Sequence, residues 1–269
     1  MVARRDLSPK RLWLRKSSAA ATCPPIVDIL RYAPEGTCPC EREVGGCFLG
    51  WGQLSAQGMD GVLITFEGGE ACGKSTQVTR LERRLVGLGR KVIAVHEPGF
   101  TEIGLSIRHL LLHPKEGQTI RPETELLLFA ASRAQLVAEV IRPALEGGTT
   151  VISDRFIDST TVYQGYGRGL DLKFIEALNQ FVVRGCRPRR TIFLDLDIET
   201  ARKRQMRRVR PVGPSDRMEQ LPNDFFETVR CGYLDIASRE PERFKIVDAS
   251  PPVDEVERMV WAELEDIFR

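Results

Sequence analysis

The stretch from Gly68 to Thr76 reads GGEACGKST and fits the spacing GxxxxGK(S/T). An apolar run, Val62 to Phe66, comes directly before it, and apolar residues at three- and four-residue steps follow it. Strand, glycine-rich turn and helix in this order predict a phosphate-binding loop. Successive backbone N–H groups of such a loop point at phosphate oxygens, and the helix presents its positive end to the same anion. The alternative, a glycine-rich turn without a ligand, is disfavoured because loop, strand and helix agree.

The residue types inside this loop predict how a nucleoside triphosphate would be held. Glycines permit positive φ and let the backbone approach the phosphates closely. We expect Lys74 to reach the β- and γ-phosphates and Ser75 to hold Mg²⁺ through its hydroxyl. The residues expected to bind ATP are Gly68, Gly69, Glu70, Ala71, Cys72, Gly73, Lys74, Ser75 and Thr76.

Composition sets limits on the class of protein. Of the 269 residues, 42% are hydrophobic, which is ordinary for a folded globular chain. The formal net charge of +2 is too small to indicate a nucleic-acid partner. The sequence has no apolar run near the roughly 18 to 20 residues of a membrane helix. The seven scattered cysteines indicate reduced thiols, and hence a cytoplasmic location.

Residues 1–58 differ from the remainder, because they carry no sustained hydrophobic period. We expect an N-terminal extension that is poorly ordered, followed by a folded domain over residues 59–269. Met59 opens the run MDGVLITFEGG, so a misassigned translation start is the favoured origin of the extension.

The extension also allows two alternatives. The first 22 residues contain a single acidic residue, Asp6, which is compatible with an organellar transit peptide. The second alternative is a small metal site with the ligands Cys38, Cys40 and Cys47. That spacing lacks a CxxC pair and a histidine partner, so it is a weak metal signal.

From Gly61 onward, short apolar runs alternate with helical patterns. We expect strands at 62–66, 91–96, 149–153, 190–196 and 244–247. We expect helices at 75–89, 101–112, 122–139, 171–184, 200–210, 219–238 and 252–268. This alternation predicts an α/β fold in which helices cover both faces of a parallel sheet. Ligands then bind beyond the carboxyl ends of the strands.

Two stretches suggest residues that act with the phosphate loop. The third expected strand ends at Asp154, which suits a Mg²⁺ carboxylate, and Arg155 beside it could fork onto an anionic phosphoryl acceptor. The alternative is a surface ion pair. Phe129 and Arg133 are four residues apart and so share a helix face, where a ring and a guanidinium could hold a planar base. Spacing alone favours a core phenylalanine and a solvated arginine.

Two further stretches are less specific. Residues 158–169 are polar, aromatic and glycine-rich, and they follow Asp154 where an acceptor pocket would lie, although an ordinary loop is equally compatible. Residues 202–210 are densely basic and run into a Pro/Gly segment, which suggests a lid that closes over a triphosphate. The alternatives are a solvated helix face or a nucleic-acid patch, and no interleaved aromatics support the latter.

Together these residues resemble the thymidylate kinase family, of the bacterial type. The matching motifs, in the family's order, are FEGGEACGKST at 66–76, EPG at 97–99, Ile107-Arg108 followed by Leu110-Leu111-Leu112, LLFAASR at 127–133, SDRFIDSTTVYQGYGRG at 153–169, FLDLD at 193–197 and DRME at 216–219. The block at 153–169 is the most specific of them. The resemblance covers roughly residues 60 to 269 and implies a P-loop nucleoside monophosphate kinase fold with a basic lid.

The resemblance also implies an activity, its partners and residue roles. The reaction would be ATP + dTMP → ADP + dTDP with Mg²⁺, in a homodimer built on helix packing. Phe129 would stack on thymine, Arg133 would bond its O4, and Tyr163 would favour deoxyribose. The expected dTMP-binding residues are Glu70, Arg108, Phe129, Arg133, Arg155, Thr160, Tyr163 and Gln164.

The same resemblance suggests the catalytic residues and the metal ligands. Ser75 and Asp154 would hold Mg²⁺. Ala71 and Cys72 stand where one branch of the family carries a basic residue, so catalytic charge should come from the lid, with Arg202, Arg204, Arg207 and Arg208 as candidates. The expected catalytic residues are Lys74, Arg155, Asp154, Arg207 and Arg208.

Two positions depart from the family pattern. His96 stands where an arginine usually precedes EPG, and Phe100 where a second glycine usually follows it. These departures weaken the case for Glu97 as a direct ligand. Another P-loop nucleotide or nucleoside kinase is the nearest alternative function, and a non-catalytic P-loop nucleotide-binding protein is the alternative from another class.

Overall fold

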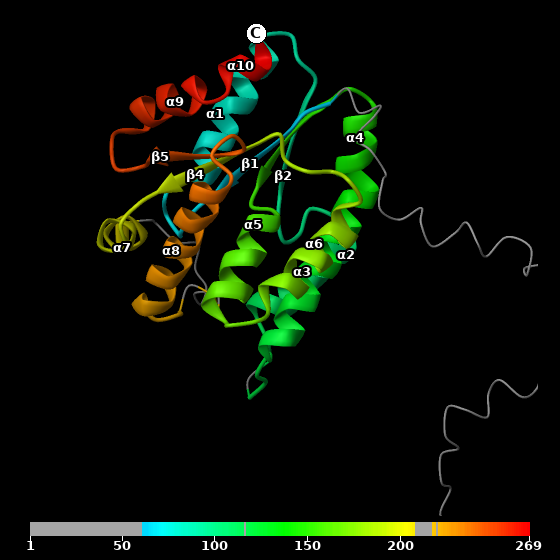
Figure 1. Cartoon of the computed structure of the whole chain (residues 1–269), viewed down its shortest axis with the longest axis vertical. Helices are drawn as coiled ribbons and strands as arrows, with labels where there is room; N and C mark the ends of the chain where they lie inside the picture. Colours follow the sequence, from blue (N-terminus) through cyan, green and yellow to red (C-terminus); the bar gives the residue numbers. More distant parts are fainter. Residues whose placement is uncertain (1–60, 116, 208–216, 219) are drawn as a thin grey trace, which may run out of the picture. The chain divides into compact units, whose positions relative to one another are not determined.

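Parallel strands form the centre of the described part of the chain. The computed structural model describes residues 61–115, 117–207, 217–218 and 220–269. Five strands of this described part make one sheet in the order β2-β3-β1-β4-β5, and each neighbouring pair is parallel (Figure 1). Their bounds are β1 Leu63–Glu67, β2 Val92–His96, β3 Thr150–Asp154, β4 Arg190–Asp195 and β5 Phe244–Asp248. Every strand predicted from the sequence is confirmed.

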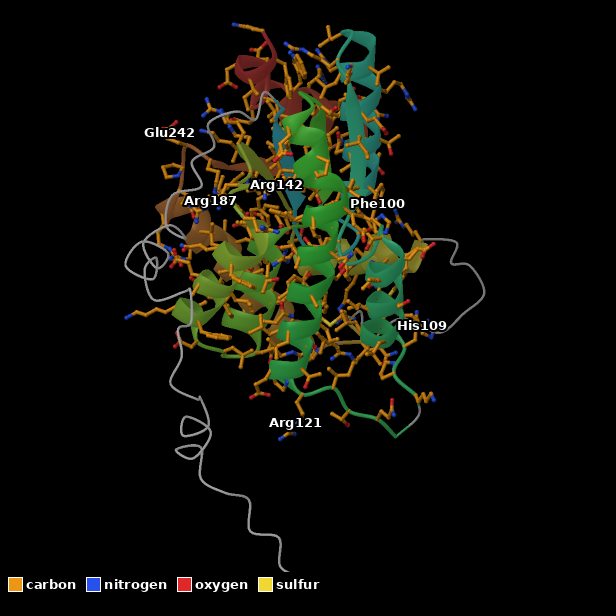
Figure 2. All side chains as sticks on the ribbon, turned by 90° about the vertical axis from the view of Figure 1, so that its right-hand side faces the viewer. Phe100, His109, Arg121, Arg142, Arg187 and Glu242 are labelled. Carbon is orange, nitrogen blue, oxygen red and sulfur yellow. The ribbon has the colours of Figure 1, made fainter. Side chains whose placement is uncertain are left out.

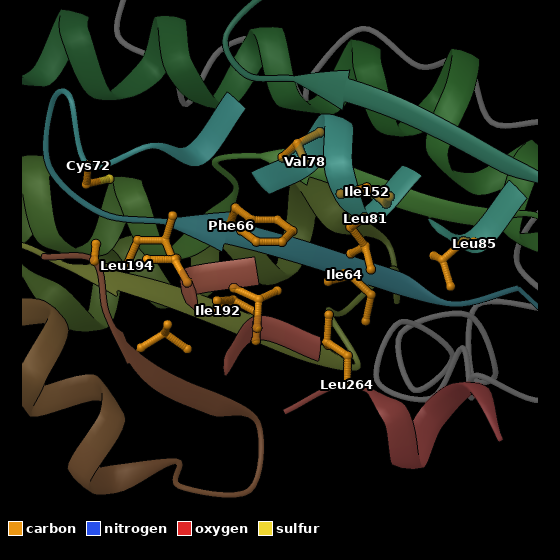
Figure 3. Close-up of a cluster of buried hydrophobic side chains, with 14 of the residues drawn as sticks. Ile64, Phe66, Cys72, Val78, Leu81, Leu85, Ile152, Ile192, Leu194 and Leu264 are labelled. Carbon is orange, nitrogen blue, oxygen red and sulfur yellow. The ribbon is translucent and has the colours of Figure 1, made fainter. Parts of the chain in front are cut away.

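Successive side chains along each strand point to opposite faces of the sheet, so the hydrophobic core is divided between the two faces. Ile64 and Phe66 of β1 pack on one face with α1 (Lys74–Gly87) and α9 (Val253–Ala262) (Figure 3). Leu63 of β1 and Val151 of β3 belong to a separate cluster, with α3 (Pro122–Leu136), α4 (Arg142–Glu146) and α6 (Leu172–Val183). Because successive side chains of a strand point to opposite faces, the two clusters lie on opposite sides of the sheet. The predicted α/β architecture is therefore confirmed.

Several helix boundaries differ from the sequence predictions. The helix expected at 122–139 runs further, through a wider π-helical turn at Val137–Ile141 into α4. Helix α8 begins at Asn223 rather than 219 and ends at Arg239. The closing helix is two pieces, α9 and α10 (Glu265–Phe268). Helix α2 (Glu102–Leu112) lies where it was expected, whereas α7 (Ile198–Arg207) begins before the predicted residue 200, and its predicted end at 210 lies outside the described residues.

The glycine-rich block after β3 is helical. It forms α5 (Ile157–Thr160) and continues as a π-helical segment, Thr161–Gly167. Packing explains two of its glycines, because a Cβ on Gly165 would lie 2.4 Å from Leu172 Cδ2 and one on Gly167 2.6 Å from Phe225 Cε2. These glycines allow neighbouring helices to approach rather than breaking the chain into a loop.

Some predictions fall outside the described residues. They concern the extension 1–58 with its three candidate metal cysteines, and Arg208 of the expected lid. Within the described ranges, no helix combines the length and the apolar character that crossing a membrane requires.

Candidate active site

The phosphate loop joins the central strand β1 to helix α1. Gly68, Ala71 and Gly73 adopt positive φ angles of 143°, 56° and 101°. The thiol of Cys72 donates to the carbonyl of Gly69 at 3.1 Å inside the curl. A loop of this shape ends at the N-terminus of α1, where helix amides and the helix dipole favour a phosphate anion.

Lys74 is the first residue of α1, and its side chain folds back over the loop. Its ammonium donates to the carbonyls of Gly69 at 2.7 Å and Gly68 at 3.2 Å. Burial and nearby Arg155 lower the pKa of Lys74, but Cys72, Glu70 and Asp154 raise it, and the net effect is an increase. The side chain therefore carries its positive charge at neutral pH beside the predicted phosphate site.

Ser75 and Asp154 meet at the carboxyl ends of two neighbouring strands. The Ser75 hydroxyl donates to Oδ2 of Asp154 at 2.7 Å. Strands β1 and β3 pair so that Phe66 is opposite Asp154, which places the aspartate beside the start of the loop. A hydroxyl and a carboxylate oxygen are the ligands that Mg²⁺ prefers, and this ion usually takes few protein ligands together with phosphates and waters. The pair therefore fits a substrate-bound Mg²⁺.

Arg155 connects the donor and acceptor sides of the site. Its Nη2 donates to Oε1 of Glu70 at 2.7 Å, and its Nη1 donates to Ser159 Oγ at 3.2 Å. Its guanidinium also lies 5.2 Å from the ring centre of Tyr163. The backbone of Arg155 has a φ of 72°, which is strained for a residue with a Cβ.

A cavity of about 300 Å³ lies beyond the carboxyl ends of β1, β2 and β3. All eight residues predicted to bind dTMP line it, together with Lys74, Ser75 and Asp154. The other lining residues are Ala71, Gly73, His96, Glu97, Pro98, Leu112, Phe156, Ser159 and Met218. The structure thus brings residues from 70 to 164 into one space next to the phosphate loop.

Arg133 is built into the core rather than solvated, which corrects the interpretation that spacing alone favoured. It is 1% exposed, and its Nε lies 2.7 Å from Glu97 Oε1. Nη1 donates to Asn179 at 2.8 Å, and Nη2 donates to Thr160 Oγ1 at 2.7 Å and to the Phe156 carbonyl at 3.1 Å. Three of the five N–H groups of this guanidinium donate in these bonds, Nε–H lies at ion-pair distance from Glu97, and one Nη1 hydrogen has no hydrogen-bond partner among the described residues.

A second buried network holds the wall of the cavity that carries Gln164. Glu125 of α3 is 1% exposed, and its Oε1 accepts from Gln164 Nε2 at 2.8 Å. Arg168 donates to both oxygens of the same carboxylate at 3.1 Å, and Arg217 Nη2 lies 2.6 Å from Oε2. Burial raises the pKa of Glu125, but the bonds from Arg168, Gln164 and Arg217 lower it by more. The net effect is a lowered pKa, so the carboxyl group stays ionised. Gln164 is thereby fixed against α3.

The remaining acceptor residues have looser contacts. Arg108 donates to the Pro98 carbonyl at 2.9 Å, and Phe129 is partly exposed on the same face of α3 as Arg133. The hydroxyl of Tyr163 is buried without a hydrogen-bond partner among the described residues. A buried polar atom on a cavity wall is costly unless a ligand or water bonds it.

Glu97 is buried beside Arg133, and its carboxyl group is close to half-protonated at neutral pH. Burial raises the pKa of this carboxyl to about 7, Arg133 opposes that rise, and the charge of Glu67 adds to it. The folded state therefore binds the proton more tightly than an unfolded chain with the ordinary value of 4.5.

We expect the stability contributed by Glu97 to be present below pH 4.5 and to be lost as the pH rises through about 7. The loss is on the order of 3 kcal/mol. Glu97→Gln should remove this slope, seen as the difference between urea-unfolding free energies of the wild type and the variant from pH 5 to 8. Glu123→Gln, at an exposed glutamate of α3, serves as the control. Parallel curves for wild type and Glu97→Gln would contradict the assignment.

The predicted lid arginines are not gathered at the cavity. Arg204 donates to the carbonyls of Ala249 at 2.8 Å and Ser250 at 2.9 Å. Arg202 lines a second cavity of about 50 Å³, which lies between β4, α7, α8 and the phosphate-loop residues Gly69 and Glu70. Arg207, at the exposed end of α7, does not line the acceptor cavity. A role for Arg207 or Arg208 on the transferred phosphate stays a prediction.

The two departures from the family pattern lie at one corner of the cavity. The rings of His96 and Phe100 meet edge to face at 5.8 Å. Phe100 has a φ of 72°, the left-handed conformation that a glycine would adopt without strain. Burial and the neighbouring Arg108 lower the pKa of His96, against the charge of Asp154. At neutral pH this residue is therefore a neutral imidazole and does not replace an arginine.

Sequence reasoning missed three residues of the site. Ser159 binds Arg155, and the buried carboxylates Glu67 and Glu125 hold segments that carry cavity residues. The available signal was a charged residue at a position where burial was expected, such as Glu67 at the end of the apolar run. Charged residues are rarely buried unless they are paired.

A phosphate loop, a strand-end aspartate and a neighbouring cavity with arginines define a nucleotide-dependent phosphotransferase of the P-loop class. A model of the thymidylate kinase family matches residues 66–260. A thymidylate kinase of Deinococcus radiodurans is 46% identical over 206 residues, covering 77% of this chain and 97% of that protein. The chain belongs to the thymidylate kinase family, whose reaction is the ATP-dependent phosphorylation of dTMP to dTDP.

Other relatives agree with this membership. A thymidylate kinase of Syntrophotalea carbinolica is 47% identical over 200 residues, which is 74% of this chain and 92% of that protein. A crystal structure of thymidylate kinase from Ehrlichia chaffeensis superposes with a TM-score of 0.59 at 31% identity. That match covers 78% of this chain and 99% of the other.

Proposed function

We propose that this chain transfers the γ-phosphoryl group of ATP directly, in line, to the phosphate of dTMP. The observation that carries the proposal is the single cavity in which all eight expected acceptor residues meet Lys74, Ser75 and Asp154. An enzyme that transfers a phosphoryl group between two nucleotides needs this adjacency, because catalysis is positioning together with charge neutralisation.

The donor side neutralises the charge of the triphosphate. Lys74 is ionised at the loop, and its contacts with Gly68 and Gly69 hold it where the β- and γ-phosphates are expected. Ser75 and Asp154 would hold Mg²⁺. That ion would supply positive charge to the triphosphate oxygens.

The acceptor side positions dTMP. Arg155 and Arg108 would bind its phosphate, and an already anionic phosphate oxygen needs no general base. Phe129 would stack on thymine, and the unused N–H of Arg133 would meet O4, with Thr160 and Gln164 beside it. Tyr163 would crowd the 2′ position, and Glu70 would meet the 3′-hydroxyl.

The test is ADP release with ATP, Mg²⁺ and a panel of acceptors: dTMP, dUMP, dCMP, AMP and thymidine. We expect strong, selective turnover of dTMP. Preference for another monophosphate would retain the phosphate chemistry but overturn the assignments of Phe129, Arg133 and Thr160. Binding of ATP without any transfer would favour the non-catalytic alternative.

We further propose that the catalytic domain is residues 59–269 and that the enzyme works in the cytoplasm. The family match lies wholly inside this range. The free thiols of Cys72, Cys186 and Cys231 are compatible with a reducing compartment. The panel should therefore be run on the full chain and on one that begins at Met59. Loss of activity in the shorter chain alone would give the extension a role.

We also propose a homodimer through α2, α3 and α6. These helices pack side by side (Figure 1). Each carries at least one exposed apolar residue: Ile103 and Leu110 lie seven apart on α2, Phe174 and Phe181 lie seven apart on α6, and Leu127 lies on α3. Figure 2 looks onto the side that carries α2 and α3, where His109 marks α2 and Arg121 precedes α3. Large exposed apolar patches mark interfaces in otherwise soluble folds.

Introducing a charge at this face should separate the subunits. We expect Leu127→Glu to weaken the dimer by about 30-fold or more, since leaving a carboxylate in an apolar interface costs roughly 2 kcal/mol or more. Sedimentation velocity over a concentration series measures the effect. Val86→Glu on α1, at a similarly exposed apolar residue, should leave the mass unchanged. An unaltered dimer in the Leu127 variant would exclude this face.

A further inference from the structure

Glu67, the last residue of β1, is a buried carboxylate that lies behind the acceptor cavity. Its side chain is 0% exposed, and it does not line the cavity. Four donors converge on its two oxygens. The amides of Phe156 and Ser159 donate to Oε1 at 2.8 and 3.2 Å, and the hydroxyls of Ser159 and Tyr233 donate to Oε2 at 2.6 and 2.8 Å. Because every neighbour donates, this set favours the carboxylate over the acid, and it opposes the burial that raises the pKa of Glu67 overall.

The backbone bond to Phe156 fixes a strained turn. Arg155 has a φ of 72°, and strained residues persist only where their surroundings over-determine them. Three bonds do so here: Arg155 N donates to the Phe66 carbonyl at 2.9 Å, Ser153 Oγ donates to the Arg155 carbonyl at 2.7 Å, and Phe156 N donates to Glu67. Glu67 therefore holds the peptide that directly follows the strained arginine.

The bond to Ser159 fixes the Arg155 side chain as well. The hydroxyl of Ser159 donates its hydrogen to Glu67, so the lone pairs of Ser159 Oγ are available to accept hydrogen bonds. Arg155 Nη1 donates to this oxygen at 3.2 Å. Burial and the charge of Asp158 raise the pKa of Glu67, whereas Arg155, Ser159 and Tyr233 lower it. The carboxylate and the guanidinium are thus coupled without touching.

We propose that Glu67 is a positioning residue that sets Arg155 for the phosphate of the acceptor nucleotide. The inference rests on the proposed role of Arg155 toward dTMP. Because Glu67 directly precedes Gly68, the same side chain ties the strand that enters the donor loop to the turn that carries the acceptor arginine. Tyr233 adds a contact from α8, the helix that follows the basic segment.

The first test is Glu67→Gln, which keeps the shape and removes the charge. We expect the KM for dTMP to rise about tenfold, the size expected when one contact to a charged group is lost. The KM for ATP should change less than about twofold, because the contacts of Lys74 and Ser75 are untouched. In an Arg155→Met background the substitution should add almost nothing, since Glu67 acts through that arginine.

A matched control separates positioning from stability. Asp158 is also buried and lies in the same helical segment, but its ion pair is with Arg243 at 2.8 Å. Asp158→Asn should lower the melting temperature and leave the KM for dTMP unchanged. If Glu67→Gln behaves in the same way, or if its effect persists in the Arg155→Met background, the inference is overturned.

A milder variant keeps the inference testable if Glu67→Gln does not fold. Tyr233→Phe removes one donor to Glu67, and Tyr233 does not line the acceptor cavity. It should raise the KM for dTMP about threefold, and an unchanged KM would contradict the inference. Failure of the proposed function is distinguishable, because the wild type itself would then not turn over dTMP.

Discussion

Replacement of Lys74 by alanine is expected to lower turnover with ATP and dTMP by about 10²- to 10³-fold, the loss that follows removal of one preorganised charge-stabilising group from a transition state. The buried ammonium lies over the loop at 2.7 Å from the Gly69 carbonyl, and its pKa is raised, so its full charge is lost in the variant. Steady-state ADP release at saturating ATP and dTMP measures the effect. Because the charge acts on the γ-phosphoryl group as it moves, the loss should appear mainly in kcat.

A second lysine provides the control for this result. Lys91→Ala removes an exposed side chain at the start of β2 and should leave turnover within about twofold, as is usual for surface changes. The melting temperatures of the two variants should be compared, since Lys74 also contacts two loop carbonyls. Near-normal turnover in a folded Lys74→Ala protein would sink the assignment of the phosphate loop.

Arg133→Met is expected to cause the largest loss of stability, about 3 to 5 kcal/mol at pH 8, because it leaves a buried carboxylate without its partner. Arg133 is 1% exposed, its Nε lies 2.7 Å from Glu97, and it also bonds Asn179 and Thr160. Urea unfolding measures the loss. Methionine keeps much of the volume, so the change reports mainly on the ion pair and hydrogen bonds.

The pH dependence and a double variant identify the cause. Without Arg133 the pKa of Glu97 rises above its value of about 7, so the variant should lose less stability at pH 6, where the acid is protonated, than at pH 8. Adding Glu97→Gln should restore part of the lost stability at pH 8, since contacting residues are not additive. If Arg133→Met loses the same stability at pH 6 and pH 8, and Glu97→Gln restores none of it, the loss of stability would be due to packing alone.

Glycine spacing and hydrophobic periodicity along the sequence predicted the phosphate loop and the strands, because these features depend on residues close together in the chain. The phosphate loop, the five strands and the meeting of residues near Ser75 with those near Asp154 follow from glycine spacing and from the rule that ligands bind at the carboxyl ends of parallel strands. The family resemblance predicted that Thr160 and Gln164 line the acceptor pocket, and in the structure both line the cavity beside the phosphate loop, while their role toward dTMP stays a prediction. The helical conformation of the segment that carries them was not foreseen.

The features that the sequence pattern did not predict depend on contacts between residues far apart in the chain. Gly165 and Gly167 resemble turn formers in the sequence, but both lie in a helical segment. There the missing Cβ leaves room for the side chains of Leu172 and Phe225. Arg133 was expected to be solvated from spacing alone, yet its partners come from positions 97, 160 and 179. The carboxylates Glu67 and Glu125 are satisfied by donors 39 to 166 residues away. Such pairings have no local signature, because they depend on how the chain folds back on itself.

The placement of Arg133 has a consequence for how this enzyme can change under selection. A residue that only touched the base could be exchanged to alter substrate choice or to escape an inhibitor that mimics thymine. Here the guanidinium donates to Asn179, Thr160 and the Phe156 carbonyl, and its Nε lies at ion-pair distance from Glu97, so most of the side chain serves to hold the core together. Substitution at this position would carry a folding defect, so a compound that contacts Arg133 from the cavity should meet few tolerated resistance mutations there.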